Sequence, residues 1–429
     1  MTTIKIRRPF AALVASLLAM TSLSEAAMAQ TSMTMLVDNA SHTIAISEAL
    51  VTAFQSKHPD VTIDIEARPG GGEGDNIVKT RLATGQMTDI FWYNSGSLLQ
   101  ALAPEKTLVD LSAEPFMEGV ADSFKQVVSA GKGVYGVPTR PAEAGGIFYN
   151  RKIYEQLGLS VPKTWAEFMA NNAKIKAAGI PAVIQTYGEP WTSQVLLLAD
   201  YYNLQKQVPD FAKNYTAGTA KFASTPAAVR GFEYLKEISD GGFLNEDFGA
   251  ARYEDGLRML AEGKGAHYPM ITFAIPALSD GYPDQINDIG FFALPAAKAE
   301  DTGLTVWMPA GFYIPKTSSN IDMAKEFLAF VASPEGCEVQ SKAVAVNGPY
   351  LIKGCVLPDN VVQSVSDLLP YFENGNNAPA LEFLSPIKGP ILEQLTVEVG
   401  SGIRQPADAA ALYDEDVRKQ ALQLGLPGR

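Results

Sequence analysis

The sequence is poor in the residues from which metal sites and nucleophilic sites are most often built. Its 429 residues include two cysteines and three histidines, and His42, His58 and His267 lie far apart in the chain. It contains no HExxH, CxxC, GxxxxGK or GxSxG pattern, so nothing points to a metalloprotease, a dithiol site, a P-loop or a hydrolase nucleophile. The glycine-rich run 70–74 does not fit GxGxxG, and we interpret it as a turn. No cofactor is expected. Carboxylates are plentiful, so a paired acid–base site stays open.

Long apolar runs are equally scarce. The one at residues 10–20 follows the basic residues Lys5, Arg7 and Arg8, and small residues at 27 and 29 come after it. This layout is typical of a cleaved secretory signal peptide, which we place at residues 1–29. The run falls short of the roughly 20 residues that a membrane span needs, which disfavours an uncleaved anchor. No cysteine follows the predicted cut, so we expect a periplasmic protein that is not a lipoprotein.

Positive charge is in deficit, since the formal net charge is −13. Removal of the signal peptide takes away three basic residues and Glu25, a net +2, and leaves −15. Such an acidic chain is not expected to bind nucleic acid or an anionic membrane through its overall field. In an exported protein the pair Cys337 and Cys355 predicts a disulfide. A catalytic thiol is disfavoured, because no histidine lies near either cysteine in sequence.

The patterns that are present predict an α/β protein. A strand at 33–37, a helix at 46–54, an alternating strand at 61–65 and a strand at 88–93 follow one another, which is the rhythm of a parallel sheet. Thr164 and Glu167 have the spacing of a helix capping box. Further strands and helices are predicted along the chain. The strands are at 147–149, 181–186, 289–294 and 311–315, and the helices at 196–202, 227–238 and 324–331, with a helical C-terminal region.

Aromatic residues at the ends of strands are the best candidates for a binding site. Ligands of open α/β folds bind beyond the carboxyl ends of strands, and ring faces suit the C–H faces of sugars. Trp92 ends a strand, Trp191 follows one beside Glu189, and Trp307 precedes a loop. Each is a candidate for ligand stacking, with ordinary packing as the alternative. Trp165, at a helix start, is assigned to the core. A ferric site at residues 201–202 is disfavoured, because adjacent helical tyrosines point in different directions.

Several motifs together resemble the extracellular solute-binding proteins of family 1, the sugar-binding group that includes maltose-binding protein. The resemblance covers nearly the whole chain after the signal peptide. Its most specific parts are Val-Tyr-Gly-Val-Pro at 134–138, Ile-Phe-Tyr-Asn-Arg at 147–151 and Pro-Lys-Thr-Trp-Ala-Glu-Phe at 162–168. Weaker matches are 88–92, 325–328, 333–336 and 401–406.

This resemblance implies a two-lobed periplasmic-binding-protein fold of type II, with a helix-flanked sheet in each lobe and the ligand in the cleft between them. It places the first lobe at 30–140 and 290–333, and the second at 141–289 and at 334–429, which ends in a helical region. Chain crossings between the lobes are expected near 140–144, 290–294 and 331–337.

The resemblance also implies ligand-binding residues. Glu143 corresponds to a carboxylate that bonds sugar hydroxyls, and Glu189 and Trp191 to a Glu-Pro-aromatic loop. Phe273 falls near a stacking Trp of the family, a departure that leaves ligand size open. Arg140 is either a solvated hinge charge or a clamp for an acidic sugar. The full set of expected ligand-binding residues is Asn39, Trp92, Asn94, Arg140, Glu143, Glu189, Trp191, Phe273 and Trp307.

The expected function is that of a monomeric periplasmic binding component of an ABC importer. It would capture a carbohydrate by hinge closure and deliver it to the membrane permease subunits. The same fold could carry a polyol, a sugar acid or a phosphorylated alcohol instead. A more distant alternative is a secreted carbohydrate-active enzyme, which would require a carboxyl pair at a fixed separation.

Overall fold

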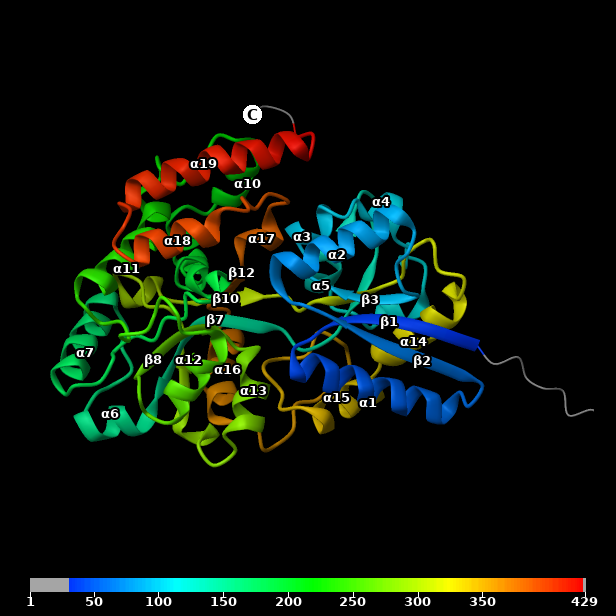
Figure 1. Ribbon diagram of the computed structural model, residues 1–429, viewed down its shortest axis with the longest axis horizontal. Coiled ribbons are helices and arrows are strands. Elements are labelled where there is room, and N and C mark those ends of the chain that lie inside the picture. Colours follow the sequence, from blue (N-terminus) through cyan, green and yellow to red (C-terminus); the bar gives the residue numbers. More distant parts are fainter. Residues whose placement is uncertain (1–30, 427–429) are drawn as a thin grey trace, which may run out of the picture.

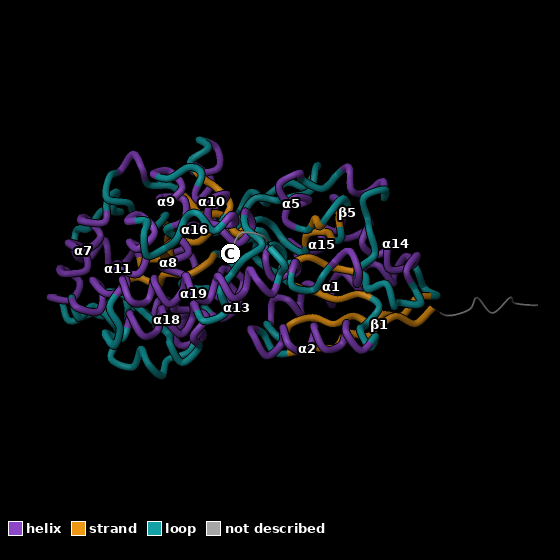
Figure 2. Tube along the Cα trace, turned by 90° about the horizontal axis from the view of Figure 1, so that it is seen from above, coloured by secondary structure: helices purple, strands orange, loops and turns teal. Residues whose placement is uncertain are grey.

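The structure is a computed structural model and describes residues 31–426. The predicted signal peptide, residues 1–29, lies outside the described residues. Figure 1 shows two bodies side by side, and Figure 2 shows from above that each has strands enclosed by helices. Two mixed sheets, one in each body, form the two lobes.

The first lobe is built on a five-stranded sheet with the order β2-β1-β3-β11-β6. Strands β1, β2 and β3 are parallel, whereas β11 is antiparallel to both β3 and β6. In Figure 1, α1 and α15 lie on one side of this sheet and α2 on the other. The strands are β1 (Thr31–Asp38), β2 (Val61–Arg68), β3 (Ile90–Tyr93), β6 (Gly136–Pro138) and β11 (Gly311–Tyr313), with a small hairpin of β4 (Ser129–Ala130) and β5 (Gly133–Val134). The helices are α1 (Ser41–Lys57), α2 (Gly71–Thr84), α3 (Ser97–Gln100), α4 (Pro104–Thr107), α5 (Asp122–Val127), α14 (Ile321–Val331) and α15 (Pro334–Ala343).

The second lobe is built on β7, which pairs with β8, β9 and β10, all antiparallel, while β12 joins β10 in parallel. Its strands are β7 (Glu143–Asn150), β8 (His267–Ile271), β9 (Ile289–Phe292), β10 (Leu304–Trp307) and β12 (Asn377–Pro379). Its helices are α6 (Arg151–Leu157), α7 (Trp165–Ala177), α8 (Val195–Ala199), α9 (Tyr201–Gln207), α10 (Phe211–Ala217), α11 (Pro226–Asp240), α12 (Tyr253–Ala261), α13 (Ala274–Gly281), α16 (Gln363–Glu373), α17 (Leu381–Leu384), α18 (Leu392–Gly400) and α19 (Pro406–Gln423).

The chain crosses between the lobes at different places from those expected, apart from the first. It leaves the first lobe between β6 and β7 and returns between β10 and β11. Strands β9 and β10, expected in the first lobe, pair instead with β7. Helix α15, expected in the second lobe, packs with its Cys337 in the core of the first. The buried core residues of the first lobe end at Ile352 and those of the second resume at Val365, so the third crossing lies between them.

Local sequence signals account for several elements. Thr164 accepts a hydrogen bond from the Glu167 amide, and the Glu167 carboxylate accepts one from the Thr164 amide, so the predicted capping box begins α7. Trp165 is buried, as expected. The predicted disulfide joins Cys337 and Cys355.

Two local predictions were wrong. The glycine-rich run 70–74 is not a turn, because α2 begins at Gly71. A Cβ on Gly74 would lie 1.8 Å from the Pro69 carbonyl oxygen, so close packing of this helix start on the end of β2 requires glycine there. The segment 181–186 is not a regular strand, since only Val183 forms bridges, to Leu244 and His267.

Candidate functional site

The carboxyl ends of the first lobe's parallel strands face the chain where it enters the second lobe. Asp38 ends β1, Arg68 ends β2 and Tyr93 ends β3. Glu143 begins β7 just beyond the first crossing; burial raises its pKa, and the charge of Asp38 adds to the rise. Ligands of open α/β sheets bind at such strand ends, so the candidate site is expected here.

At the crossing, Arg140 and Glu143 form a buried ion pair. Arg140 Nη2 lies 3.1 Å from Glu143 Oε1, and Asn347 Nδ2 donates to the same oxygen at 3.2 Å. Burial raises the pKa of Glu143, whereas Arg140 and Asn347 oppose that rise. Arg140 is 9% exposed, so the expectation of a solvated hinge charge was wrong.

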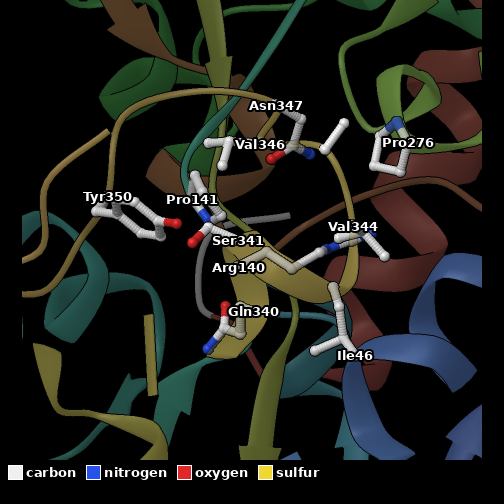
Figure 3. Close-up of a pocket in the computed structure, with 11 residues that line it drawn as sticks. Ile46, Arg140, Pro141, Pro276, Gln340, Ser341, Val344, Val346, Asn347 and Tyr350 are labelled. Carbon is white, nitrogen blue, oxygen red and sulfur yellow. The ribbon is translucent and has the colours of Figure 1, made fainter. Parts of the chain in front are cut away.

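Arg140 lines a pocket at the junction of the lobes. Its lining includes Ile46 of α1 in the first lobe, Pro276 of α13 in the second, and Val344 and Asn347 from the segment after α15. Figure 3 shows the Arg140 side chain extending between Ile46 and Val344. The pocket therefore changes shape whenever α1 and α13 move relative to each other.

Three aromatic rings of the second lobe form a cluster beside this junction. Trp191 lies 5.5 Å from Tyr253 and 5.7 Å from Phe273, measured between ring centroids. Tyr253 and Phe273 stack at 5.6 Å with planes 26° apart. The charges of Arg140 and Glu143 both act on Tyr253, whose pKa burial raises well above its ordinary value. The Tyr253 hydroxyl is buried and bonds no residue within 31–426. The cluster thus offers ring faces and one unpaired hydroxyl.

Glu189 positions this cluster through hydrogen bonds to the start of α12. It precedes the short 3-10 turn at Pro190–Gln194 that carries Trp191. One of its oxygens accepts from Arg252 Nη2 at 2.9 Å and the other from the Tyr253 amide at 2.7 Å. Both oxygens are thus engaged at the start of α12, which differs from the expected contact with a ligand. In this structure Glu189 positions Tyr253.

Two further candidate rings, Trp92 and Trp307, lie on the sheets of different lobes. Trp92, on β3, is 8% exposed, and its ring centroid lies 5.6 Å from the guanidinium carbon of Arg68. Trp307, on β10, is the register partner of Glu143. Its indole nitrogen donates to Glu382 Oε1 at 2.6 Å, and Lys388 Nζ holds the other Glu382 oxygen at 3.2 Å. Trp307 is therefore tied into the second lobe.

The remaining two candidates lie at the edge of the site. Asn39, between β1 and α1, is exposed. Asn94, after β3, is half-buried, and its backbone carbonyl accepts from the Tyr313 hydroxyl at 3.3 Å. Within residues 31–426, neither side chain makes a hydrogen bond or an ion pair, so Glu143 and Trp191 are the stronger candidates.

The structure adds residues that the sequence analysis missed. They are His42, Arg68, Tyr253, Glu382 and Lys388. Arg68 could have been found, because it ends an alternating strand just as Tyr93, next to Trp92, ends the following one. Tyr253 and Lys388 reach the site through the packing of helices far apart in sequence, and no local pattern marks them.

Within residues 31–426, no group of three or more His, Cys, Asp or Glu side chains is arranged to hold a metal ion. None of the helices in the same range has the length and apolar character needed to cross a membrane.

Comparisons with known proteins agree with this geometry. The model of the bacterial extracellular solute-binding protein family matches residues 39–336. The multiple sugar-binding protein of Streptococcus mutans is 24% identical over 319 residues, which is 72% of this chain and 73% of that protein. The melibiose/raffinose/stachyose-binding protein MelE of Bacillus subtilis is 23% identical over 352 residues, 76% of each chain.

Solved structures give the same fold. The solute-binding protein RafE in complex with raffinose has a TM-score of 0.76 at 20% identity, with 92% of this chain and 99% of that one covered. A chitin oligosaccharide binding protein has a TM-score of 0.77 at 20% identity, with the same coverage. The two lobes, their crossings and the family match lead to one conclusion: this chain belongs to the bacterial extracellular solute-binding proteins, which bind solutes and are not enzymes.

Proposed function

We propose that this protein captures an oligosaccharide in the periplasm and delivers it to the permease subunits of an ABC importer. The observation that carries the proposal is the cluster of Trp191, Tyr253 and Phe273 next to the buried Arg140–Glu143 pair. Ring faces stack on the C–H faces of sugars, and paired charged groups bond the hydroxyl rim. The predicted signal peptide supports the periplasmic assignment.

The relatives support the ligand class. Their names specify multiple sugars, melibiose, raffinose and stachyose, and arabinooligosaccharides. Solved neighbours include a complex with raffinose and one with stachyose. An oligosaccharide that contacts both Trp92 of the first lobe and Trp191 of the second would use the candidate rings of both lobes.

Binding would act by hinge closure. A ligand that contacts both lobes stabilises the conformation in which they touch, and so shifts the equilibrium between open and closed forms. The permease would then recognise the closed shape, with the ligand released unchanged.

A thermal-shift screen tests the proposal, because a ligand that binds only the folded protein stabilises it by about 2.7 kcal/mol at 100 times its Kd. The panel contains raffinose, melibiose, stachyose, an arabinooligosaccharide and chitin oligosaccharides, with sorbitol, galacturonate and glycerol phosphate as rival classes. We expect a rise in Tm with at least one oligosaccharide and recovery of that sugar intact. A shift with only a rival compound, or a chemically altered sugar, would refute it.

A further inference from the structure

Arg68 has unused hydrogen-bonding capacity inside the molecule. It is 3% exposed, and its Nη1 donates to the Pro69 carbonyl at 2.9 Å. Its Nε and Nη2 are buried and have no hydrogen-bond partner within residues 31–426. These two nitrogens lie along one edge of the planar guanidinium, where their N–H groups run side by side. Two buried donors without hydrogen bonds cost free energy, and buried donors in folded proteins are nearly always paired.

The free edge is held in place from the opposite side. A Cβ on Gly74 would lie 2.2 Å from Arg68 Nη1, so the first turn of α2 packs tightly against that nitrogen. The guanidinium carbon lies 5.6 Å from the centroid of the Trp92 ring and 5.8 Å from that of Tyr93. Arg68 is therefore a rigid donor beside the aromatic end of β3, in the region where strand ends meet the second lobe.

The charge of Arg68 is already compensated. Asp38 and Asp75, both of the first lobe, act on it and oppose the effect of burial on its pKa. Lys388 of the second lobe acts in turn on Asp75. Two carboxylates of the protein thus already balance the positive charge of Arg68. Its free edge therefore needs hydrogen-bond acceptors from a ligand, and the ligand needs no negative charge of its own.

Arg140 differs in this respect. Its unpaired nitrogens are Nε and Nη1, because Nη2 is held by Glu143. Nε and Nη1 do not share one edge of the guanidinium, so the two unpaired nitrogens of Arg140 do not form a parallel pair of donors. Of the two buried arginines near the crossing, Arg68 is the one whose two unpaired nitrogens share an edge.

We infer that Arg68 is a ligand-binding residue that determines specificity, its Nε and Nη2 donating to two adjacent oxygens of an uncharged sugar ring that lies on Trp92. The inference rests on the proposed function. In this assignment the first lobe makes a two-point hydrogen-bonding contact with the sugar, whereas the second lobe contributes mainly ring faces. A sugar ring that lacks either of the two oxygens would leave a buried donor unpaired, and this penalty gives the selectivity.

Isothermal titration of raffinose, or of whichever saccharide the screen identifies, tests this with Arg68→Lys. Lysine keeps the positive charge but lacks the planar fork, and we expect Kd to rise about tenfold or more. The matched control is Arg81→Lys on α2, where Arg81 forms a half-exposed ion pair with Glu66; its Kd should not change. An unchanged Kd for Arg68→Lys would overturn the inference.

Deoxy analogues of the bound saccharide provide a second readout that also works if Arg68→Lys does not fold. In the native protein, removal of either of two adjacent hydroxyls should weaken binding, and Arg68→Lys should no longer distinguish those analogues. Uniform tolerance of every single deoxy analogue would overturn the inference. So would tighter binding of an oligogalacturonate than of its neutral counterpart, since the acceptor would then be a carboxylate. If the native protein binds no saccharide at all, the proposed function itself fails.

Discussion

His42 on α1 of the first lobe contacts Phe273 at the start of α13 of the second, with ring centroids 6.2 Å apart and planes inclined by 38°. His42 is 4% exposed. Burial lowers its pKa to about 3, and the charge of Arg140 adds to the effect. No carboxylate acts on His42 in the described chain to offset that charge. The imidazole is thus a neutral ring at the point where the lobes touch.

This contact predicts that ligand affinity falls in acid. Opening of the lobes exposes His42 to water, where its pKa returns to about 6.5. His42 has the lower pKa in the closed form. Its contribution to the stability of that form is therefore complete above about pH 6.5 and is lost as the pH falls from there towards 3. We expect Kd to rise by up to about tenfold for each pH unit below about 6.5. Titration calorimetry between pH 5 and 8 measures this.

The histidine responsible can be identified by substitution. His42→Phe keeps a ring against Phe273 but cannot bind a proton, so its Kd should vary much less with pH. His58→Gln, at the exposed end of α1 beside Glu326, is the control and should behave like the native protein. A His42→Phe profile as steep as the native one would assign the effect to other groups.

Gly96 predicts a steric limit on closure. It follows β3, and a Cβ there would lie 2.7 Å from the Glu382 carbonyl oxygen and 2.7 Å from the Phe383 ring, both in the second lobe. Gly96→Ala should therefore disfavour the closed form and weaken saccharide binding several-fold. Small-angle scattering of the saturated protein should show a larger radius of gyration than for the native complex.

A matched control separates this clash from backbone strain. Gly96 has φ of 68° and ψ of −138°, and Gly85 has φ of 70° and ψ of 20°, so alanine is strained at both positions and more severely at Gly96. The nearest atom to a Cβ on Gly85 is Thr317 Cγ2 of the same lobe, at 3.9 Å. Gly85→Ala should lower stability and leave Kd unchanged. Equal effects of the two variants on Kd would rule out the interlobe clash as the cause.

The parts of the fold that were predicted are those with local causes. The alternation in 61–65 reflects a strand with one buried face, and the Thr164–Glu167 box is complete within four residues. The run 70–74 was misread because glycine disfavours helices, whereas tight packing of Gly74 against Pro69 outweighs that propensity. Strands β9 and β10 were assigned to the wrong lobe, since nothing in a short apolar run specifies its partner.

The candidate site divides in the same way. Trp92 and Trp191 could be proposed from sequence because strand ends and loops place aromatics near ligands. Tyr253 was missed because its place beside Trp191 depends on the bond from its amide to Glu189, 64 residues away in sequence. Arg140 was assigned two roles from sequence, and its burial against Glu143, which no local pattern predicts, contradicts the solvated one.

Trp191→Ala should weaken ligand binding by about 1 kcal/mol or more, the scale of a lost aromatic partner, which is roughly fivefold in Kd. The ring is half-buried and contacts Tyr253 and Phe273, so its loss also loosens the cluster. Titration calorimetry gives the change in Kd. Trp191→Phe preserves a ring and should lose less. Unchanged affinity for Trp191→Ala would remove the cluster from the site.

The disulfide predicts a stability effect that belongs to the first lobe. Cys337 on α15 and Cys355 are 18 residues apart, and both pack against the core of that lobe. Closing a loop of this size stabilises a protein by about 3 kcal/mol in the chain-entropy model. The free energy of unfolding of the double variant Cys337→Ser/Cys355→Ser, measured by urea denaturation, should be lower by that amount. The native protein in dithiothreitol should match it, and dithiothreitol should not affect the variant. A common midpoint for the oxidised protein and the double variant would mean that the bridge contributes nothing, because the packing of α15 on α1 already restrains the same loop.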